Sequence, residues 1–232
     1  MSLKSSCIGY YKFEGDSVDS VGANNGSASA ITYSTGNGKI GQGAGFNGTS
    51  SIINLGSALS ATNSLSYYST SQWVYFNALP AGGSVIAGKY NNTQNQFFLQ
   101  TFSTTEIAAG VCNTITSTDY GATTGLGLVT GQWYHIVTVF DGTLSGNSNR
   151  FKLFVNNVQK TLTFTNTIPS LTTNSTSSFL LGQLINAYFL NGNLDEFCHF
   201  NSALTTTEIN QLYNLSQYPF TDNNGFLNFF MS

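Results

Sequence analysis

Charged side chains are scarce in this sequence. Only 7% of its 232 residues are Asp, Glu, Lys or Arg, against about 25% in an average soluble protein. Seven Lys and Arg against ten Asp and Glu give a net charge of −3. The chain therefore lacks the basic surface with which proteins bind nucleic-acid phosphates. Its polar surface must consist mainly of Asn, Thr, Ser, Gln and Gly, which favour turns, loops and, for Thr, strands.

Cysteine and long apolar runs are scarce as well. Cys7, Cys112 and Cys198 are an odd number without CxxC spacing, which argues against a complete disulfide set and against zinc and predicts small buried hydrophobes. No run of about 18 apolar residues is present, so we expect no membrane span. Residues 1–15 contain no apolar segment typical of a signal peptide. Two explanations stay open: a signal peptide that has already been removed, or a protein carried on a virion.

Short β-type segments separated by turn residues fill most of the chain. The strongest is QWYHIVTVF at 132–140, and a longer β-rich run covers 65–79. We also expect a hairpin over 43–55 around Asn47-Gly48, and loops at 14–29 and 113–131. Further strands are predicted at 7–13, 84–89, 96–102, 106–112, 151–158 and 178–184. Many short strands of this kind predict an all-β, two-sheet antiparallel sandwich.

One short C-terminal helix is expected over Thr206–Asn214. Thr205 and Glu208 have capping-box spacing, and Ile209, Leu212 and Tyr213 form an apolar stripe. We therefore predict one domain over 1–214, followed by an aromatic C-terminal tail over 215–232. The tail would pack on its own sandwich or on a neighbouring subunit, because exposed aromatic patches usually mark contacts.

The stretch Leu190–Leu204, LNGNLDEFCHFNSAL, carries two adjacent acids in a predicted strand. Regular alternation would place Asp195 and Glu196 on opposite faces. Both faces carry aromatic rings, so at least one carboxylate is expected to be buried, with a metal or backbone amides as its partner. A second acidic stretch, the loop at 14–29, contains Glu14, Asp16 and Asp19. Either solvation or a hard cation with oxygen ligands would suit that loop.

Several segments together resemble one known family. They are YYKFEGDSVDSVGANNG, FNGTSSIINLG, GQWYHIVTVFDGT, FKLFVNNVQ and GNLDEFCHFNSALTTTEINQLYN, in that order over residues 7–214. This series resembles laminin-G-like domains of the concanavalin A-like lectin/glucanase superfamily, which implies a jelly-roll fold. Two places depart from the family pattern: Asn157 stands where the turn usually has Gly, and Cys198-His199-Phe200 follows the Asp-Glu pair.

The resemblance also implies a structural calcium ion (Ca²⁺). Many relatives hold one between the Asp-Ser-x-Gly loop and the Asp-Glu strand, and Asp19 and Asp195 fall on these places. Asp16, Asp19 and Asp195 are therefore the expected metal ligands, with backbone carbonyls completing the shell. The alternative is that backbone amides satisfy Asp195 and that the loop is solvated.

Catalysis is not expected. Glycoside hydrolases need two carboxylates across the scissile bond, and the acids of this sequence show no such spacing on a predicted strand. His135 and His199 are expected to be core histidines, and Trp73 and Trp133 core rings. Tyr33, Tyr90, Tyr120 and Tyr188 lie in or beside predicted loops and are better placed for contact, although they do not define a binding site.

The function implied is a non-catalytic, lectin-like module for recognition or adhesion. Its partner would be a glycan or glycoprotein surface, and its location extracellular or on a virion surface. The alternative is a purely structural coat or protein–protein interaction domain of a virus or phage particle, in contact with neighbouring subunits. A glycoside hydrolase is the less favoured third reading.

Overall fold

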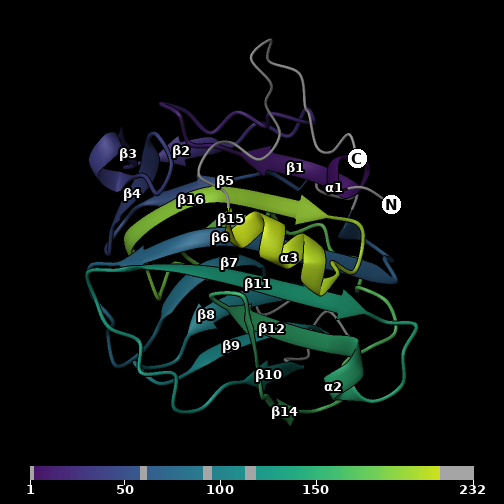
Figure 1. Ribbon diagram of the computed structural model, residues 1–232. Coiled ribbons are helices and arrows are strands. Elements are labelled where there is room, and N and C mark those ends of the chain that lie inside the picture. Colours follow the sequence, from purple (N-terminus) through teal and green to yellow (C-terminus); the bar gives the residue numbers. More distant parts are fainter. Residues whose placement is uncertain (1–2, 58–61, 91–95, 113–118, 215–232) are drawn as a thin grey trace.

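The structure, a computed structural model, describes residues 3–57, 62–90, 96–112 and 119–214. Two antiparallel sheets pack face to face, and helix α3 (Thr206–Tyr213) lies on the outer face of the first sheet (Figure 1). The predicted all-β sandwich with one short C-terminal helix is therefore confirmed. The tail at 215–232 lies outside the described residues.

The first sheet has the strand order β13-β12-β11-β6-β16-β4-β3, and β1 also pairs with β16. The long strands β6, β11 and β16 lie in the middle of this sheet. They are buried almost throughout, since one of their faces meets the core between the sheets and the other meets the layer that contains α3. The strands are β1 (Cys7–Tyr11), β3 (Thr32–Ser34), β4 (Gly43–Asn47), β6 (Tyr67–Phe76), β11 (Trp133–Asp141), β12 (Phe151–Val155), β13 (Val158–Lys160) and β16 (Asn191–Phe200).

The second sheet has the order β14-β10-β9-β8-β7-β15-β5-β2. Its strands are β2 (Ser27–Ser29), β5 (Ile52–Asn54), β7 (Ser84–Lys89), β8 (Phe97–Thr101), β9 (Ile107–Val111), β10 (Tyr120–Ala122), β14 (Thr163–Thr165) and β15 (Leu180–Leu181). Strands β2 and β10 lie inside the stretches predicted as loops. Three short helical segments complete the described elements: α1 (Leu3–Ser6), η1 (Thr35–Asn37) and α2 (Asn147–Arg150).

Three layers of apolar side chains stabilise this arrangement. The main core lies between the sheets and includes Phe76, Ile136 and Leu99. A second cluster joins α3 to the outer face of the first sheet through Ile209 and Leu212. The third cluster, on the outer face of the second sheet, borders the site described below.

The predicted hairpin at Asn47-Gly48 is wrong. β4 pairs with β16 and β3 in the first sheet, whereas β5 pairs with β15 and β2 in the second. The segment between them is a tight arch, in which Asn47 Oδ1 accepts hydrogen bonds from the backbone N–H groups of Thr49, Ser50 and Ser51. The same Asn-Gly chemistry that closes hairpins thus carries the chain from one sheet to the other.

The helix begins as its sequence indicates. Thr205 Oγ1 accepts from Glu208 N, and the Glu208 carboxylate accepts from Thr205 N, which completes the capping box. The β12–β13 hairpin turns at Asn156 and Asn157, which have φ values of 50° and 63°, the left-handed pair that a type I′ turn requires. In the described part of the chain, no helix is long and apolar enough to cross a membrane.

Candidate functional site

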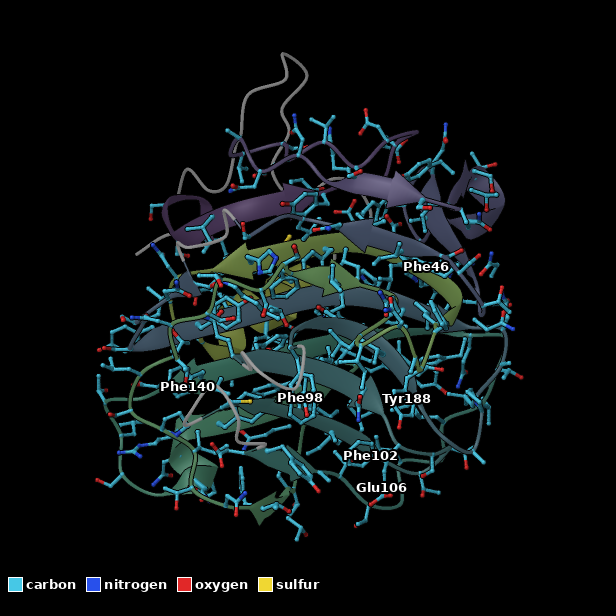
Figure 2. All side chains as sticks on the ribbon, turned by 180° about the vertical axis from the view of Figure 1, so that it is seen from behind. Phe46, Phe98, Phe102, Glu106, Phe140 and Tyr188 are labelled. Carbon is cyan, nitrogen blue, oxygen red and sulfur yellow. The ribbon has the colours of Figure 1, made fainter. Side chains whose placement is uncertain are left out.

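A cavity of about 290 Å³ opens on the outer face of the second sheet, and we call it the aromatic groove. Its lining residues are Tyr90, Phe98, Gln100, Phe102, Tyr120, Leu184, Ile185 and Tyr188. In Figure 2, Phe98, Phe102 and Tyr188 lie on the side of the second sheet, which faces the viewer, and Glu106 lies past Phe102.

Strand β8 supplies one wall through its alternation. Phe97 and Leu99 belong to the core between the sheets, so the intervening Phe98 and Gln100, with Phe102 just beyond the strand, face outward. The outward side chains of Phe98, Gln100 and Phe102 therefore form a row of two rings and one amide. Six consecutive residues, FFLQTF, thus serve the core and the groove at once.

Small residues on β9 lie beside the rings of β8. Ala108 lies opposite Gln100 and Gly110 lies opposite Phe98. A Cβ added to Gly110 would come within 1.9 Å of the carbonyl oxygen of Asp119, so this position admits no side chain. Backbone atoms of Asp119 and Tyr120 and the Cβ of Tyr120 fill the space above Gly110 instead, so β10 packs closely there and brings the ring of Tyr120 next to Phe98.

The rings along this wall contact one another edge to face. Tyr90 and Phe98 have centroids 5.9 Å apart at 68°, and Phe98 and Tyr120 are 5.8 Å apart at 65°. Phe102 meets Tyr120 at 5.7 Å and 85°. These contacts fix the ring orientations, so the wall is held in place before any ligand arrives.

A turn between β15 and β16 forms the opposite wall. Ile185 and Asn186 both have left-handed φ values, 50° and 53°, and Ala187 N donates to Leu184 O at 2.9 Å. A β-branched residue rarely adopts positive φ, so Ile185 is held there at a cost of about 1–2 kcal/mol. Tyr188, with φ of 56°, follows and is 50% exposed, and its carbonyl accepts from Val85 N.

The structure brings together three of the four tyrosines that the sequence placed near loops. Tyr90, Tyr120 and Tyr188 line the aromatic groove, whereas Tyr33 lies in β3 of the other sheet, with its hydroxyl 2.5 Å from Ser17 Oγ. Phe98, Gln100 and Phe102 were missed as site residues. Their alternation with core residues in FFLQTF was the available signal, but alternation does not tell which outward face is hollow.

The two tryptophans do not lie in the groove. Trp73 is buried under α3, where it stacks on Tyr213 at 5.7 Å and Lys39 Nζ lies 4.5 Å from its ring centroid. Trp133 packs beside Tyr75 at 5.5 Å and is half-buried. The prediction that Trp73 is a core ring is therefore confirmed.

Both histidines are buried, as predicted. His135 Nε2 lies 2.8 Å from Ser71 Oγ, and His199 Nδ1 lies 2.6 Å from the hydroxyl of Tyr68. Burial lowers the pKa of each imidazole to about 3. They are neutral packing residues at physiological pH, away from the groove.

The three predicted calcium ligands have different surroundings. Asp19 is buried, and its carboxylate accepts hydrogen bonds from the backbone N–H groups of Tyr10, Val21, Gly22 and Asn24. Asp195 accepts from the amides of Lys39, Ile40 and Glu196. Asp16 is exposed and accepts from Val18 N.

Backbone amides thus hydrogen-bond both buried carboxylates, as the alternative to calcium expected for Asp195, whereas Asp19 is buried and not solvated. In the described residues, no group of three or more His, Cys, Asp and Glu side chains is placed to hold a metal. A calcium ion bound by Asp16, Asp19 and Asp195 stays a prediction, and it would depend on carbonyl oxygens for most of its shell.

The adjacent acids Asp195 and Glu196 do not lie on opposite faces, which corrects the sequence prediction. A β-bulge interrupts the pairing of β16 with β6 between Asp195 and Cys198, and Glu196 has φ of 53°. The extra residue shifts the alternation, so Leu194 and Phe197 both face the core between the sheets. Glu196 instead reaches Tyr10, whose hydroxyl donates to Glu196 Oε2 at 2.5 Å.

Both acids of this pair are buried. Asp195 is 0% and Glu196 5% exposed. Burial raises the pKa of Asp195 to about 7, against the lowering effect of its three amide donors. Burial, and then the charge of Asp195, raise the pKa of Glu196 well above its usual value. The pair is closed to a polymeric substrate and lies on the first sheet, whereas the groove lies on the second.

Comparisons with known proteins agree with this architecture. The family model described as the concanavalin A-like lectin/glucanases superfamily matches residues 47–210. Among curated proteins, none matches the chain. Domain 4 of AbnA, an extracellular arabinanase from Geobacillus stearothermophilus solved in complex with arabinotriose, is 23% identical with a TM-score of 0.67. That alignment covers 90% of this chain and 98% of the arabinanase domain.

Trypanosoma rangeli sialidase is also similar, at 14% identity and a TM-score of 0.63. Here the alignment covers 90% of this chain but only 32% of the sialidase. At these identities the likeness establishes the fold alone.

Proposed function

This chain belongs to the concanavalin A-like lectin/glucanases superfamily, and we propose that it is a non-catalytic carbohydrate-binding module whose ligand lies in the aromatic groove. The observation that carries this proposal is the ordered row of rings that lines a cavity on the outer face of the second sheet. Ligand sites combine aromatic walls with a few placed polar groups. A sugar ring fits that combination, because its C–H face stacks on an aromatic ring while its hydroxyls reach amides such as Gln100.

The lining also supports binding without hydrolysis. Glycoside hydrolysis uses two carboxyl groups about 5–9.5 Å apart around the scissile bond. The described residues that line the groove include no Asp or Glu, and Asp195 and Glu196 are buried on the other sheet. The similar arabinanase domain was solved with arabinotriose bound, which makes arabinan a natural first ligand to test.

Tyr188→Ala tests the groove directly. A tyrosine offers roughly 150–250 Å² of surface, and Tyr188 is 50% exposed. Covering about half of its exposed area with one sugar ring removes about 50 Å² from water, or about 1.3 kcal/mol. The variant should therefore bind about tenfold more weakly, as measured by isothermal titration with arabinan, xylan and β-glucan oligosaccharides that the wild type retains.

Tyr67→Ala is the matched control. Tyr67 is also an exposed tyrosine, 41% accessible, but it begins β6 in the first sheet. Its loss should leave glycan affinity unchanged. Equal losses in both variants, or no retention of any glycan by the wild type on a diverse array, would refute the proposal. Sustained release of reducing ends from these polysaccharides would refute its non-catalytic part.

We propose that the module works outside the cell or on a virion surface, in adhesion or recognition. Laminin-G-like domains are typically extracellular, and a low-charge surface rich in Thr, Asn and Ser suits an exposed coat. Immunogold labelling of intact particles and of the secreted fraction tests this location. Labelling confined to the cell interior would overturn it.

A further inference from the structure

We propose that the ligand is an uncharged oligosaccharide of several consecutive units, which extends from the aromatic groove into a second cavity beside it. The inference rests on the proposed function and adds to it the length and charge class of the ligand. Its basis is the geometry of the two adjoining cavities and the chemistry of their walls.

The second cavity, which we call the polar pocket, measures about 370 Å³. It shares Tyr90 and Ile185 with the aromatic groove, so the two cavities adjoin at these side chains. Its lining residues are Ile52, Asn54, Tyr90, Ser177, Ser178, Leu180, Gln183, Ile185 and Asn186. The left-handed turn at Ile185 and Asn186 therefore forms a boundary common to both cavities.

Size indicates a ligand longer than one sugar. Each cavity alone lies near the lower end of the roughly 300–1,000 Å³ found for small-molecule sites, and both together lie well inside that range. A single sugar ring stacked in the aromatic groove would leave the polar pocket empty. A chain that passes Tyr90 and Ile185 would fill both.

Gln183 gives an independent reason to expect a ligand in the polar pocket. Its side chain lines the pocket and is 5% exposed, yet its Oε1 has no hydrogen-bond partner among the described residues. A buried acceptor left without a donor is unfavourable. A sugar hydroxyl entering the pocket is a donor of the right kind once a small rotation of the amide exposes this buried oxygen, and Asn54 and Asn186 offer further amide groups beside the pocket.

The charge of the walls selects among oligosaccharides. In the described part of the chain, the residues lining the two cavities include no Lys, Arg, His, Asp or Glu. A uronic or sialic acid unit would lose hydration there without gaining a cationic partner. Neutral chains meet rings, aliphatic side chains, hydroxyls and amides, and the hydroxyls and amides satisfy sugar hydroxyl groups without such a loss.

A ladder of oligosaccharides tests the inference on the full-length protein. Neutral arabino- and xylo-oligosaccharides from disaccharide to octasaccharide are titrated by calorimetry, beside uronic-acid oligosaccharides of matched length. Affinity should rise with chain length until both cavities are filled and then level off. The acidic series should bind at least about tenfold more weakly, since one unmatched buried polar group already costs that much.

Gln183→Leu tests the polar pocket separately from the aromatic groove. This variant should bind the longest neutral oligomer on the order of tenfold more weakly and the disaccharide as well as wild type does. Asn54→Ala, at a half-buried position of β5, repeats the test if Gln183→Leu melts early. Tyr188→Ala should weaken binding at every length.

The outcomes distinguish the two proposals. Retention of no glycan by the wild type defeats the proposed function itself. Glycan binding that is independent of length, or that Gln183→Leu and Asn54→Ala leave unchanged for the longest oligomer, overturns only the extended site. Equal affinity for the acidic series overturns the uncharged class.

Discussion

Glu196→Gln should change how the stability of this protein depends on pH. Glu196 lies at the bulge of β16, where Tyr10 donates a hydrogen bond to its Oε2 and its Oε1 has no partner among the described residues. Gln has nearly the same size and shape but binds no proton in this range. The substitution therefore removes one titrating group and keeps most of the packing.

The size of the effect follows from proton counting. The relevant window lies between pH 4.5 and pH 6.5, the ordinary pKa values of Glu and His. Within it, His135 and His199 are protonated in the unfolded chain. In the folded chain they are not, because burial lowers both pKa values to about 3. These two groups make stability fall as pH falls.

The buried acids act in the opposite sense. In the folded chain the pKa of Asp195 is raised to about 7 and that of Glu196 is raised well above its usual value. Both therefore hold protons that the unfolded chain releases, and their contribution is lost as pH rises through the folded pKa. The two protons that the unfolded chain binds on its histidines match the two that the folded chain holds on Asp195 and Glu196. The wild-type free energy of unfolding should therefore be nearly independent of pH in this window.

In Glu196→Gln the folded state binds one proton fewer. The free energy of unfolding should then rise with pH by about 1.4 kcal/mol per pH unit relative to wild type. Urea denaturation at several pH values across the window, followed by tryptophan fluorescence, measures both slopes. The difference between the slopes depends on Glu196 alone, since the other three groups are common to both proteins.

Tyr10→Phe is the control, because it removes the hydrogen bond and leaves the titrating carboxyl. It should lower stability by about 1–3 kcal/mol at every pH in the window, with the wild-type slope. A Glu196→Gln profile parallel to wild type would show that the folded state does not hold this proton, and the reasoning would fail.

Three further predictions concern the ion, the tail and the helix. If a structural calcium ion binds, free calcium at about 100 dissociation constants should stabilise the fold by roughly 2.7 kcal/mol, or about 5–10 °C in melting temperature, and identical melting in calcium and in excess chelator would exclude it. Deleting residues 215–232 should lower the melting temperature or dissociate an assembly, whereas unchanged melting and unchanged mass by light scattering would show that the tail makes no stabilising contact. Thr205→Ala should cost about 1 kcal/mol of stability by urea denaturation, because it removes the oxygen that accepts from Glu208 N, and a loss below a few tenths of a kcal/mol would contradict this.

Local sequence determined most of the longer strands and where the helix begins, although β2 and β10 lie in stretches predicted as loops. Ser84–Lys89 forms β7 over the predicted range, and the capping box at Thr205 and Glu208 starts α3. These features depend on side-chain periodicity and on contacts between near neighbours, which any reader of the sequence can count. The burial of Trp73 and of both histidines followed from the same reasoning, because each lies within a predicted strand that also carries aromatic or aliphatic side chains.

Tertiary structure alone decided which strands pair and which faces meet. Asn47-Gly48 has the chemistry of a hairpin, yet it joins two sheets, because β4 and β5 find their partners far away in the sequence. The bulge at Glu196 likewise arises where β16 must pair with β6 and contact Tyr10 together. One inserted residue changes the face of every later side chain, and no local sequence pattern predicts where such an insertion occurs.

The groove shows the same division. The sequence by itself indicated four tyrosines beside predicted loops as candidates for contact, of which Tyr33 lies elsewhere, and it showed that the chain carries little charge. Only the register of β8 against β9, and of β9 against β10, placed Phe98 opposite Gly110 and next to Tyr120. A cavity is a relation among residues far apart in the chain, and it exists only once pairing and packing have fixed their positions.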